Sequence, residues 1–282
     1  MDENQSFPAW PASQWRIIVS PPAAGAWNMA VDEAILDHVG AGLSLPTLRL
    51  YTWQPGCLSL GFSQPISHVN QQAVHQHGWH LVRRPTGGQA VLHIDELTYA
   101  VIAPLDEPRV KGSVLTAYRH LSLGLLAALR KLGLQPAADS IYAQEQENPR
   151  DPACFQNPSN YEITVNGYKL VGSAQARRVD GVLQHGSIPL FGDITRILIC
   201  LSHVQNLTSA QEQLRRHAAN LESILGKAPD LTAVQTALME GFASALNINF
   251  TSPQNLTNSE KVRSEELMRI KYQSDHWTAR IE

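Results

Sequence analysis

The sequence predicts an α+β fold built on a mixed or antiparallel sheet. Segments with strand character dominate the first two-thirds of the chain and follow each other in hairpin-like order. Helical segments interrupt them and prevail after about residue 200. This order differs from the regular strand–helix alternation that marks a parallel doubly wound sheet. At 282 residues the chain can form one large domain, or one domain with a small appendage.

Three segments are expected along the chain. Residues 1–14 are rich in Pro, Ser and Asn and are expected to form a loose arm. Residues 15–250 would form the main domain, and residues 251–282 a helical extension packed on it. The hydrophobic share of 43% is ordinary for a soluble globular chain and suffices for a substantial core.

The first elements are one helix and a run of strands. Residues 24–42 are expected to be helical, because apolar residues recur at helical spacing and glycines end the run. Asp32 and Glu33 are expected near the positive end of this helix. The following segments are expected to be strands 47–53 and 57–63, a short helix within 68–79, a strand–turn–strand unit over 80–94 and a strand over 97–104.

Caps and turns define the later elements. Ser113 is expected to cap a helix that runs through Leu132 and ends at Gly133. The pair Asn166-Gly167 favours a type I′ turn, which predicts a hairpin over residues 161–174. The remaining expected elements are a strand over 182–191, a clear helix over 230–247 and a charged helix over 258–277.

Charge and cysteine content exclude several classes of protein. The net charge of −3 provides no basic field for nucleic acid or a membrane surface. No apolar run approaches the roughly 20 residues of a membrane-spanning helix, and the acidic start lacks the features of a secretory signal. Three widely spaced cysteines do not make a disulfide framework. A cytoplasmic protein is therefore expected.

The stretch "RRPTGGQAVLH", residues 83–93, is the densest candidate for a functional site. Gly87 and Gly88 allow the backbone to approach a ligand closely. The stretch is neither a P-loop nor a dinucleotide-binding motif, since no Gly-Lys-Ser/Thr and no helix follow the glycines. Taken alone, it favours a hairpin turn with solvated arginines. Arg83 and Arg84 alternate along a strand, so at most one is expected to face a pocket and the other solvent or a partner.

The histidines have ordinary structural interpretations when they are considered alone. His93 suits a hydrogen-bonded histidine of a hairpin. His75, His77 and His80 have a spacing that suits no common zinc site, and no cysteine is near. A polar helix face is the favoured interpretation of this trio, and no metal is expected.

Cys154 lies in a polar, proline-flanked loop. Two interpretations stay open for this residue, a packing role and a reactive thiol. Cys57 and Cys200 lie in apolar runs, where packing is favoured. Lys169 alternates with apolar neighbours, and taken alone it is an outward-facing strand lysine.

Several motifs occur together in one order. They are "NMAVDEAIL", "RRPTGGQAVLHIDELTYAV", "KLVGSAQARR", "LQHGSIPL" and "IKYQSDHW". In this combination they resemble the signature of the biotin/lipoate protein ligase A/B superfamily, over roughly residues 15 to 280. "CFQNPSNYE", which begins at Cys154, is similar to an element of the cysteine-dependent octanoyltransferase branch and precedes Lys169 at that branch's interval. Gln-Ala after "RRPTGG", in place of a third glycine, also suits the transferases better than the ligases.

The resemblance implies an α+β fold with flanking helices and a small second sheet. It further implies that residues 15–250 transfer octanoate from acyl carrier protein, through a thioester on Cys154, to a lysine of a lipoyl domain such as the glycine-cleavage H protein. A thiolate is the reactive form of cysteine, and the resemblance gives Lys169 the role of lowering the thiol pKa. No ATP, metal or other cofactor is expected.

The resemblance also implies substrate-binding residues. It places Gly87 and Gly88 along the acyl tunnel and His93 at the polar end of the pocket, with Gly172 and Ser173 on the strand that follows Lys169. Both carrier proteins are acidic in this family, so local positive charge is expected to steer them. The residues expected to supply it are Arg83, Arg84, Lys169, Arg177 and Arg178.

Three other functions stay open at the level of the sequence. An ATP-dependent lipoate ligase is disfavoured by Cys154 and by the missing third glycine. An amidotransferase that moves octanoate between lipoyl domains is poorly separated from the first choice. A non-catalytic binder of lipoyl domains on the same fold is the third.

Overall fold

The protein is built around a long mixed sheet. The computed structural model describes residues 10–139 and 162–282. Within these residues the sheet has eight strands in the order β11–β1–β2–β6–β10–β9–β8–β7. β1 pairs in parallel with β2 and β11, whereas the remaining neighbours are antiparallel. The strands are β1 (Ser13–Val19), β2 (Thr47–Tyr51), β6 (Glu96–Ala103), β7 (Pro136–Asp139), β8 (Glu162–Val165), β9 (Tyr168–Arg177), β10 (Val182–Pro189) and β11 (Ile248–Phe250).

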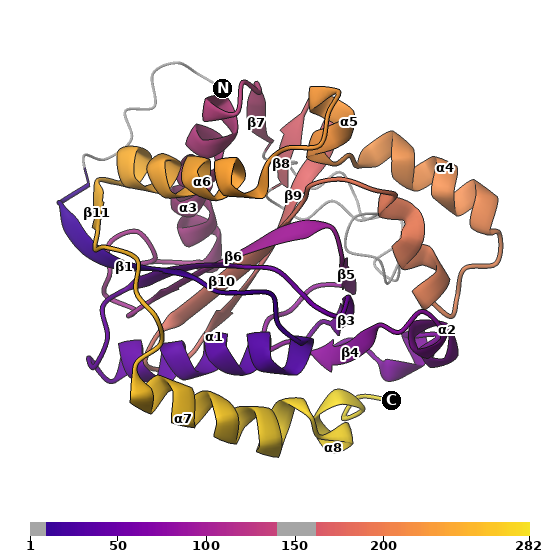
Figure 1. The fold of residues 1–282 in the computed structure, drawn as a ribbon, viewed down its shortest axis with the longest axis horizontal. Helices are drawn as coiled ribbons and strands as arrows, with labels where there is room; N and C mark the ends of the chain where they lie inside the picture. The colour runs from indigo at the N-terminus through magenta and orange to yellow at the C-terminus, as the bar shows by residue number, and fades with distance from the viewer. Residues whose placement is uncertain (1–9, 140–161) are drawn as a thin grey trace.

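A second, three-stranded sheet lies beside one end of the long one, next to the short helix α2 (Gln71–Gln76) (Figure 1). Its central strand β3 (Cys57–Leu60) runs parallel to β4 (His80–Arg83) and antiparallel to β5 (Val91–His93). The predicted hairpin of residues 80–94 is therefore wrong, because β3 separates the two strands. The α+β class, the mixed sheet and the small second sheet are confirmed.

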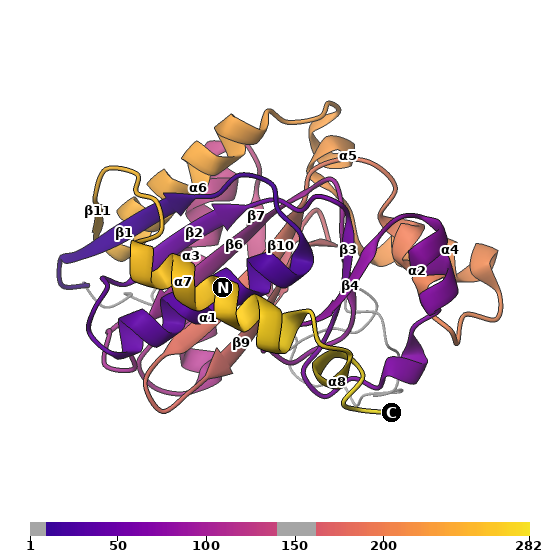
Figure 2. The same cartoon turned by 60° about the horizontal axis from the view of Figure 1, so that its bottom comes forward.

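Two pairs of helices cover the faces of the long sheet (Figures 1 and 2). α3 (Val114–Lys131) and α6 (Leu231–Leu246) pack on one face, where Tyr99, Leu125 and Phe242 belong to one buried cluster. α1 (Gly25–Gly40) and α7 (Asn258–Leu267) lie on the other face, over a cluster that includes Met29 and Ala100.

Most local signals in the sequence act as expected. Ser113 accepts a hydrogen bond from the Thr116 amide and caps α3, and Gly133 adopts a φ of +83° just after that helix. Asn166 and Gly167 both have positive φ, 53° and 82°, as a type I′ turn between β8 and β9 requires. Asp230 caps α6 at the predicted start.

The position of the acidic pair in α1 differs from the expectation. The helix begins at Gly25, so Asp32 and Glu33 lie two turns inside it, away from the positive end. Both are buried and bound to other side chains, Asp32 to Arg49 and Glu33 to Lys271. Their placement reflects packing and ion pairing rather than the helix dipole.

An early and a late segment of the chain meet on the long sheet. Ser13 and Gln14, within the segment expected to be a loose arm, already belong to β1, and β11 pairs beside them. Neither strand was expected. The Arg16 guanidinium on β1 binds the Glu260 carboxylate of α7 at 2.6 Å, with both side chains buried.

The expected helix over residues 258–277 is interrupted. After α7 the chain forms a π-helical turn, Met268–Tyr272, and then a short helix, α8 (Asp275–Thr278). The other helical segments described are η1 (Ile66–His68), η2 (Ile194–Cys200), α4 (Leu207–His217) and α5 (Leu221–Leu225). In the described part of the chain, each helix is too short or too polar to span a bilayer.

Candidate functional site

A narrow cavity lies where the two sheets meet, and we call it the junction pocket. Its apolar walls are Met29 from α1, Tyr51 and Trp53 from the end of β2, and Val91 from β5. The strands β9 and β10 close it from the long sheet, through Gly172, Ser173 and Ala174 and through the residues 185–187. A cavity with apolar walls and a few converging polar groups is typical of a small-molecule site.

Gly186 lets β10 pass close to its neighbours behind this pocket. A Cβ at this position would lie 2.5 Å from the Tyr99 ring and 2.7 Å from the Gly172 carbonyl oxygen. Both contacts are closer than atoms can approach, so only glycine fits here. The Tyr99 hydroxyl in turn hydrogen-bonds Ser173 at 2.7 Å and fixes that pocket residue.

The aromatic wall of the pocket is held by hydrogen bonds. Trp53 donates its indole N–H to Thr98 Oγ1 at 2.8 Å and stacks on His93, with ring centroids 3.9 Å apart. Tyr51 donates its hydroxyl to Asp32 Oδ2 at 2.8 Å. These bonds lock the rings, so the apolar wall has a defined shape.

His93 belongs to a buried pair with Glu96. Its Nδ1 donates to Glu96 Oε1 at 2.8 Å, and its Nε2 shares a hydrogen bond of 2.8 Å with Ser59 Oγ. Glu96 also accepts hydrogen bonds from the Thr98 and Ser187 hydroxyls. Burial alone would raise the pKa of Glu96, but the charge and hydrogen bonds of these partners outweigh it and lower the pKa.

A second buried acid, Asp32, organises the opposite wall. It binds the Arg49 guanidinium at 2.7 Å and accepts a hydrogen bond of 3.3 Å from His185 Nδ1. Burial would raise the pKa of Asp32, yet Arg49 and His185 hold it below its usual value. Burial lowers the pKa of His185, and Asp32 offsets this only in part. The net effect is a pKa of His185 below its usual value.

Arg84 links the two acid–histidine pairs. Its guanidinium donates to Thr86 Oγ1 and to Ser59, and Thr86 shares a hydrogen bond of 2.7 Å with His185 Nε2. It also donates to the carbonyls of Gly87 and Gln89 and so holds the glycine turn. Arg84 is thus the arginine of the pair that lines the pocket.

Arg83 does not face solvent or a partner, so that expectation is wrong. It is fully buried, and its guanidinium donates to the carbonyls of Gly61, Phe62 and Gln64 and to those of Trp277 and Thr278 in the C-terminal segment. Trp277 returns a hydrogen bond of 2.9 Å to the Arg83 carbonyl. Arg83 therefore holds α8 against the small sheet.

Replacing Arg83 by Gln is expected to loosen the C-terminal segment. The shorter glutamine amide cannot donate to all five carbonyls that Arg83 binds. Each buried polar group left without a hydrogen bond costs about 1–3 kcal/mol. We therefore expect the free energy of unfolding to fall by roughly 3 kcal/mol. Thermal unfolding measures the loss, and limited proteolysis should cut first after residue 267. Arg130→Gln, at an exposed position on α3, is the control. Equal proteolysis of both variants would contradict this role.

Lys169 lies three residues before Gly172 on β9. It does not point outward: its side chain is 4% exposed, and its Nζ binds Glu162 Oε1 on β8 at 2.5 Å. It lies next to the junction pocket along the strand but is not among the residues that line it. Its expected partner, Cys154, lies outside the described residues.

The two described cysteines are packing residues, as predicted. Cys57 and Cys200 are both fully buried. Burial raises the pKa of the Cys57 thiol, with a smaller contribution from Glu96, and raises that of Cys200 to about 12. Both therefore stay protonated near neutral pH.

The structure brings four of the predicted site residues together at the junction pocket: Arg84, His93, Gly172 and Ser173. Gly87 and Gly88 lie in the turn held by Arg84. Both are exposed, and neither lines the junction pocket. Gly88 has a φ of +88°, which favours glycine, and its carbonyl comes so close to Gly61 that a Cβ there would overlap it.

The expected basic cluster does not form an exposed patch. Arg83, Arg84 and Lys169 are buried, and the exposed Arg178 lies within ion-pair distance of Glu33, Asp37 and Asp180. Arg177 donates to the Val110 carbonyl. Three of the five residues are thus inaccessible at the surface, and the other two are bound to neighbouring groups of the fold.

Sequence reasoning missed most of the polar groups around the pocket, among them Asp32, Thr86, Glu96 and His185. Asp32 and Glu96 each stand beside a second acid, Glu33 and Asp95, in segments of α1 and β6 that are otherwise largely apolar, and both are buried. Their contacts with His185 and Ser187 come from a distant part of the chain, which the sequence order alone does not reveal.

The histidine trio of α2 and β4 shows no metal-site geometry. His77 Nδ1 bonds the Ala73 carbonyl of its own helix at 2.8 Å, and its ring stacks on Trp79. Over residues 10–139 and 162–282, no group of three or more His, Cys, Asp or Glu side chains is arranged to hold a metal ion.

Comparison with known proteins agrees with this architecture. Residues 24–243 match the lipoyl protein ligase A/B catalytic domain. An octanoyltransferase LipM of Brevibacillus brevis is 41% identical over 275 residues, which cover 95% of this chain and 99% of that protein. The corresponding protein of Bacillus subtilis is 38% identical over 271 residues, covering 93% and 97%.

Solved structures share the fold at lower sequence identity. The bi-partite lipoate protein ligase of Thermoplasma acidophilum superposes with a TM-score of 0.78 at 23% identity, over 95% of this chain and 96% of that one. A lipoate-protein ligase A bound with ATP gives 0.77 at 24% identity, over 94% and 98%. On the matched catalytic domain and the near full-length relatives, the chain belongs to the lipoyl protein ligase A/B family, on the branch that holds these octanoyltransferases.

Proposed function

We propose that this enzyme, an octanoyltransferase of lipoate biosynthesis, takes octanoate from acyl carrier protein onto Cys154 and passes it to a lysine of a lipoyl domain. The glycine-cleavage H protein is the proposed acceptor. The observation that carries the proposal is the junction pocket, an apolar slot with polar groups on its rim, formed partly by the strand that bears Lys169.

The junction pocket suits a medium-length acyl chain. Met29, Trp53 and Val91 offer carbon surface, and each buried methylene contributes about 0.8 kcal/mol to binding. Ser187 and His93 lie on the polar side, where a thioester carbonyl requires hydrogen-bonding groups. The hydrogen bonds of Trp53 and Tyr51 keep the slot in shape, which favours chains that fit its length.

The proposed reaction has two steps. The Cys154 thiolate attacks the carbonyl carbon of the octanoyl thioester, a new C–S bond forms, and the carrier leaves as a thiolate that takes up a proton. The neutral amine of the acceptor lysine then attacks the enzyme thioester, forms an amide, loses a proton and returns the Cys154 thiolate. Thiol-for-thiol exchange is nearly isoenergetic, and aminolysis runs downhill.

The described residues support this assignment of roles. Cys57 and Cys200 are buried thiols with raised pKa values and are unsuited to nucleophilic attack. The ion pair with Glu162 fixes the Lys169 ammonium at one place on β9. In the proposal this ammonium stabilises the Cys154 thiolate and lowers the thiol pKa from its ordinary value of about 8.5.

Shortening Met29 is expected to change chain-length preference. Met29→Ala removes a side chain that is 1% exposed and lines the pocket, so the slot becomes deeper. The ratio of kcat/KM for a decanoyl donor to kcat/KM for an octanoyl donor should rise about tenfold. An effect of this size is expected when one or two methylenes of the acyl chain gain or lose contact with the pocket wall. Leu36→Ala, in the same helix but outside the pocket lining, is the control. An equal ratio in both variants would place the chain elsewhere.

One assay separates the proposed function from its rivals. The enzyme is given octanoyl-acyl carrier protein and apo H protein without ATP, and octanoylated H protein is followed by mass. The proposal predicts octanoylation under these conditions. AMP release and acceptor modification only with free lipoate and ATP would identify a ligase instead. Transfer only from octanoyl-H protein would identify an amidotransferase, and binding without transfer a non-catalytic protein.

A further inference from the structure

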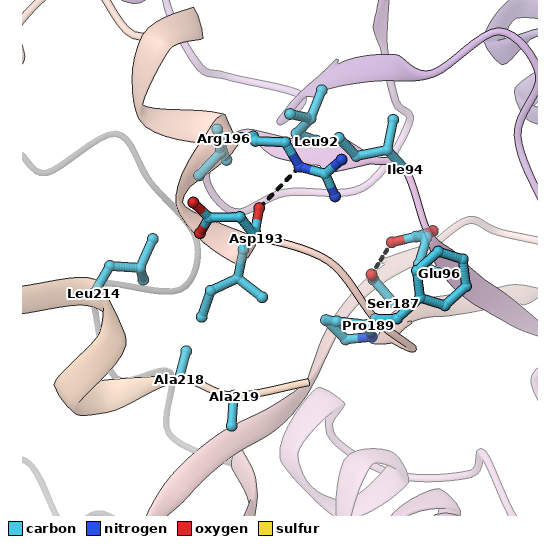
Figure 3. A pocket seen from close by; sticks show the side chains of 13 residues that line it. Leu92, Ile94, Glu96, Ser187, Pro189, Asp193, Arg196, Leu214, Ala218 and Ala219 are labelled. Atoms are coloured by element: carbon cyan, nitrogen blue, oxygen red, sulfur yellow. Dashed lines mark hydrogen bonds between the residues drawn. The ribbon is translucent and has the colours of Figure 1, made fainter. Parts of the chain in front are cut away.

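A second cavity, which we call the side chamber, has one lining residue in common with the junction pocket. Figure 3 shows the residues that line it. Leu92, Ile94, Pro189 and Leu214 give it mainly apolar walls. Glu96 and Ser187 are the polar residues at its inner side, joined by a hydrogen bond, and Ser187 also lines the junction pocket. Ser187 is therefore a wall residue of both spaces.

The side chamber continues toward the surface. Asp193, Ile194, Ala218 and Ala219 line both the chamber and a wider, more open cavity beyond it. That outer cavity lies between the tip of the β8–β9 hairpin and the connection from α4 to α5. The outer cavity and the chamber thus share these four wall residues, and the chamber shares Ser187 with the junction pocket.

Lys169 lies beside this series of cavities. The Ala219 amide donates to the Lys169 carbonyl at 3.0 Å, which fixes one wall of the chamber to β9. The chamber therefore lies between the surface and the part of β9 that holds both Lys169 and the pocket residue Gly172.

The outer mouth carries exposed positive charge. The last turn of α4 holds Arg215, Arg216 and His217, and all three side chains are exposed. Arg215 lines the outer cavity and binds Asp193 at 3.0 Å, and Arg216 lies 3.9 Å from the Glu212 carboxylate. Exposed guanidinium groups are suited to bind a phosphate.

We infer that the side chamber and the outer cavity bind the phosphopantetheine arm of the acyl donor, with its phosphate on the last turn of α4. The inference rests on the proposed function and names the path by which its donor enters. A donor whose acyl chain lies in the junction pocket must extend its arm outward from the carbonyl, and the chamber that begins at Ser187 offers that route. A lysine arm fits less well, because it is short and its ammonium is repelled by the basic mouth.

Donors with long and short arms test the inference. Ala219→Phe places a ring where the chamber and the outer cavity join. Loading of the enzyme from octanoyl-acyl carrier protein should fall at least tenfold, whereas loading from octanoyl-N-acetylcysteamine should change less than twofold. Ala233→Phe, on the exposed side of α6, should load from both donors as the unaltered enzyme does. Equal losses with both donors, or no loss with either, would overturn the inference.

A surface variant tests the mouth independently of packing. The double variant Arg215→Ala, Arg216→Ala should raise the KM for octanoyl-acyl carrier protein at least fivefold at low salt. This KM should also depend less on salt concentration than in the unaltered enzyme. The KM for octanoyl-N-acetylcysteamine should not change. The matched control is Arg130→Ala with Lys131→Ala at the end of α3. Unchanged KM would overturn the phosphate site. If the unaltered enzyme forms no adduct with either donor, the proposed function itself fails, and the inference with it.

Discussion

Lys169→Met is expected to lower the rate of octanoyl transfer at pH 7 by about a hundredfold or more. In the proposed mechanism the ammonium stabilises the Cys154 thiolate, and without it the thiol returns to a pKa near 8.5, where only a few per cent is ionised at neutral pH. The alkylation rate of Cys154 by iodoacetamide should then rise with pH up to about 8.5, whereas the unaltered enzyme should reach its plateau at lower pH.

The same substitution is expected to destabilise the protein. The buried Glu162 carboxylate loses its ion pair with Lys169, and breaking a buried pair from one side costs about 3–5 kcal/mol. Adding Glu162→Gln removes the buried negative charge, so the double variant should recover much of the thermal stability but none of the activity. Recovery of both would show that Lys169 acts only through folding and would contradict its chemical role.

Asp32→Ala is expected to cost about 3–5 kcal/mol in the free energy of unfolding. The Asp32 carboxylate compensates the fully buried Arg49 guanidinium and accepts hydrogen bonds from Tyr51 and His185. Its removal leaves an uncompensated buried charge beside the junction pocket. Urea unfolding measures the loss. Asp230→Ala, which removes only the cap of α6, should cost about 1 kcal/mol.

The loss should depend on pH in a defined direction. The pKa of Asp32 is lowered in the folded protein, so its contribution is present above about pH 4 and disappears as the pH falls through the folded value. The difference in stability between the unaltered protein and Asp32→Ala should therefore shrink below pH 4. A difference that is the same at pH 3 and pH 7 would show that Asp32 is not the compensating charge.

Local rules in the sequence were sufficient for elements whose signals lie close together. The Ser113 cap, the Asn166-Gly167 turn and the apolar stripes of α3 and α6 all act within a few residues, and the structure has these elements at the expected places. The α+β class followed from the order of such segments.

Long-range pairing was less predictable. The insertion of β3 between β4 and β5, and the parallel alignment of β11 beside β1, bring together segments that are separated along the chain, so they do not follow from local pattern. The helix predicted over residues 258–277 has a charged pattern, and its break follows from Tyr272 being buried against Glu33.

The site was predictable in part, through motifs rather than geometry. Arg84, His93, Gly172 and Ser173 line the junction pocket. The motif made Arg83 look equivalent to Arg84, yet the carbonyls that bind Arg83 belong to the C-terminal segment, nearly two hundred residues away. Buried partners of this kind become visible only in three dimensions.

The most direct test of the account is the intact mass of the enzyme after mixing with octanoyl-acyl carrier protein in the absence of acceptor. The unaltered protein should gain one octanoyl group, and apo H protein should then remove it. Cys154→Ser should gain none, while Cys57→Ser, at a buried thiol, should still be acylated. The same adduct on Cys154→Ser, or no adduct on the unaltered enzyme while it still transfers octanoate, would contradict a thioester at position 154.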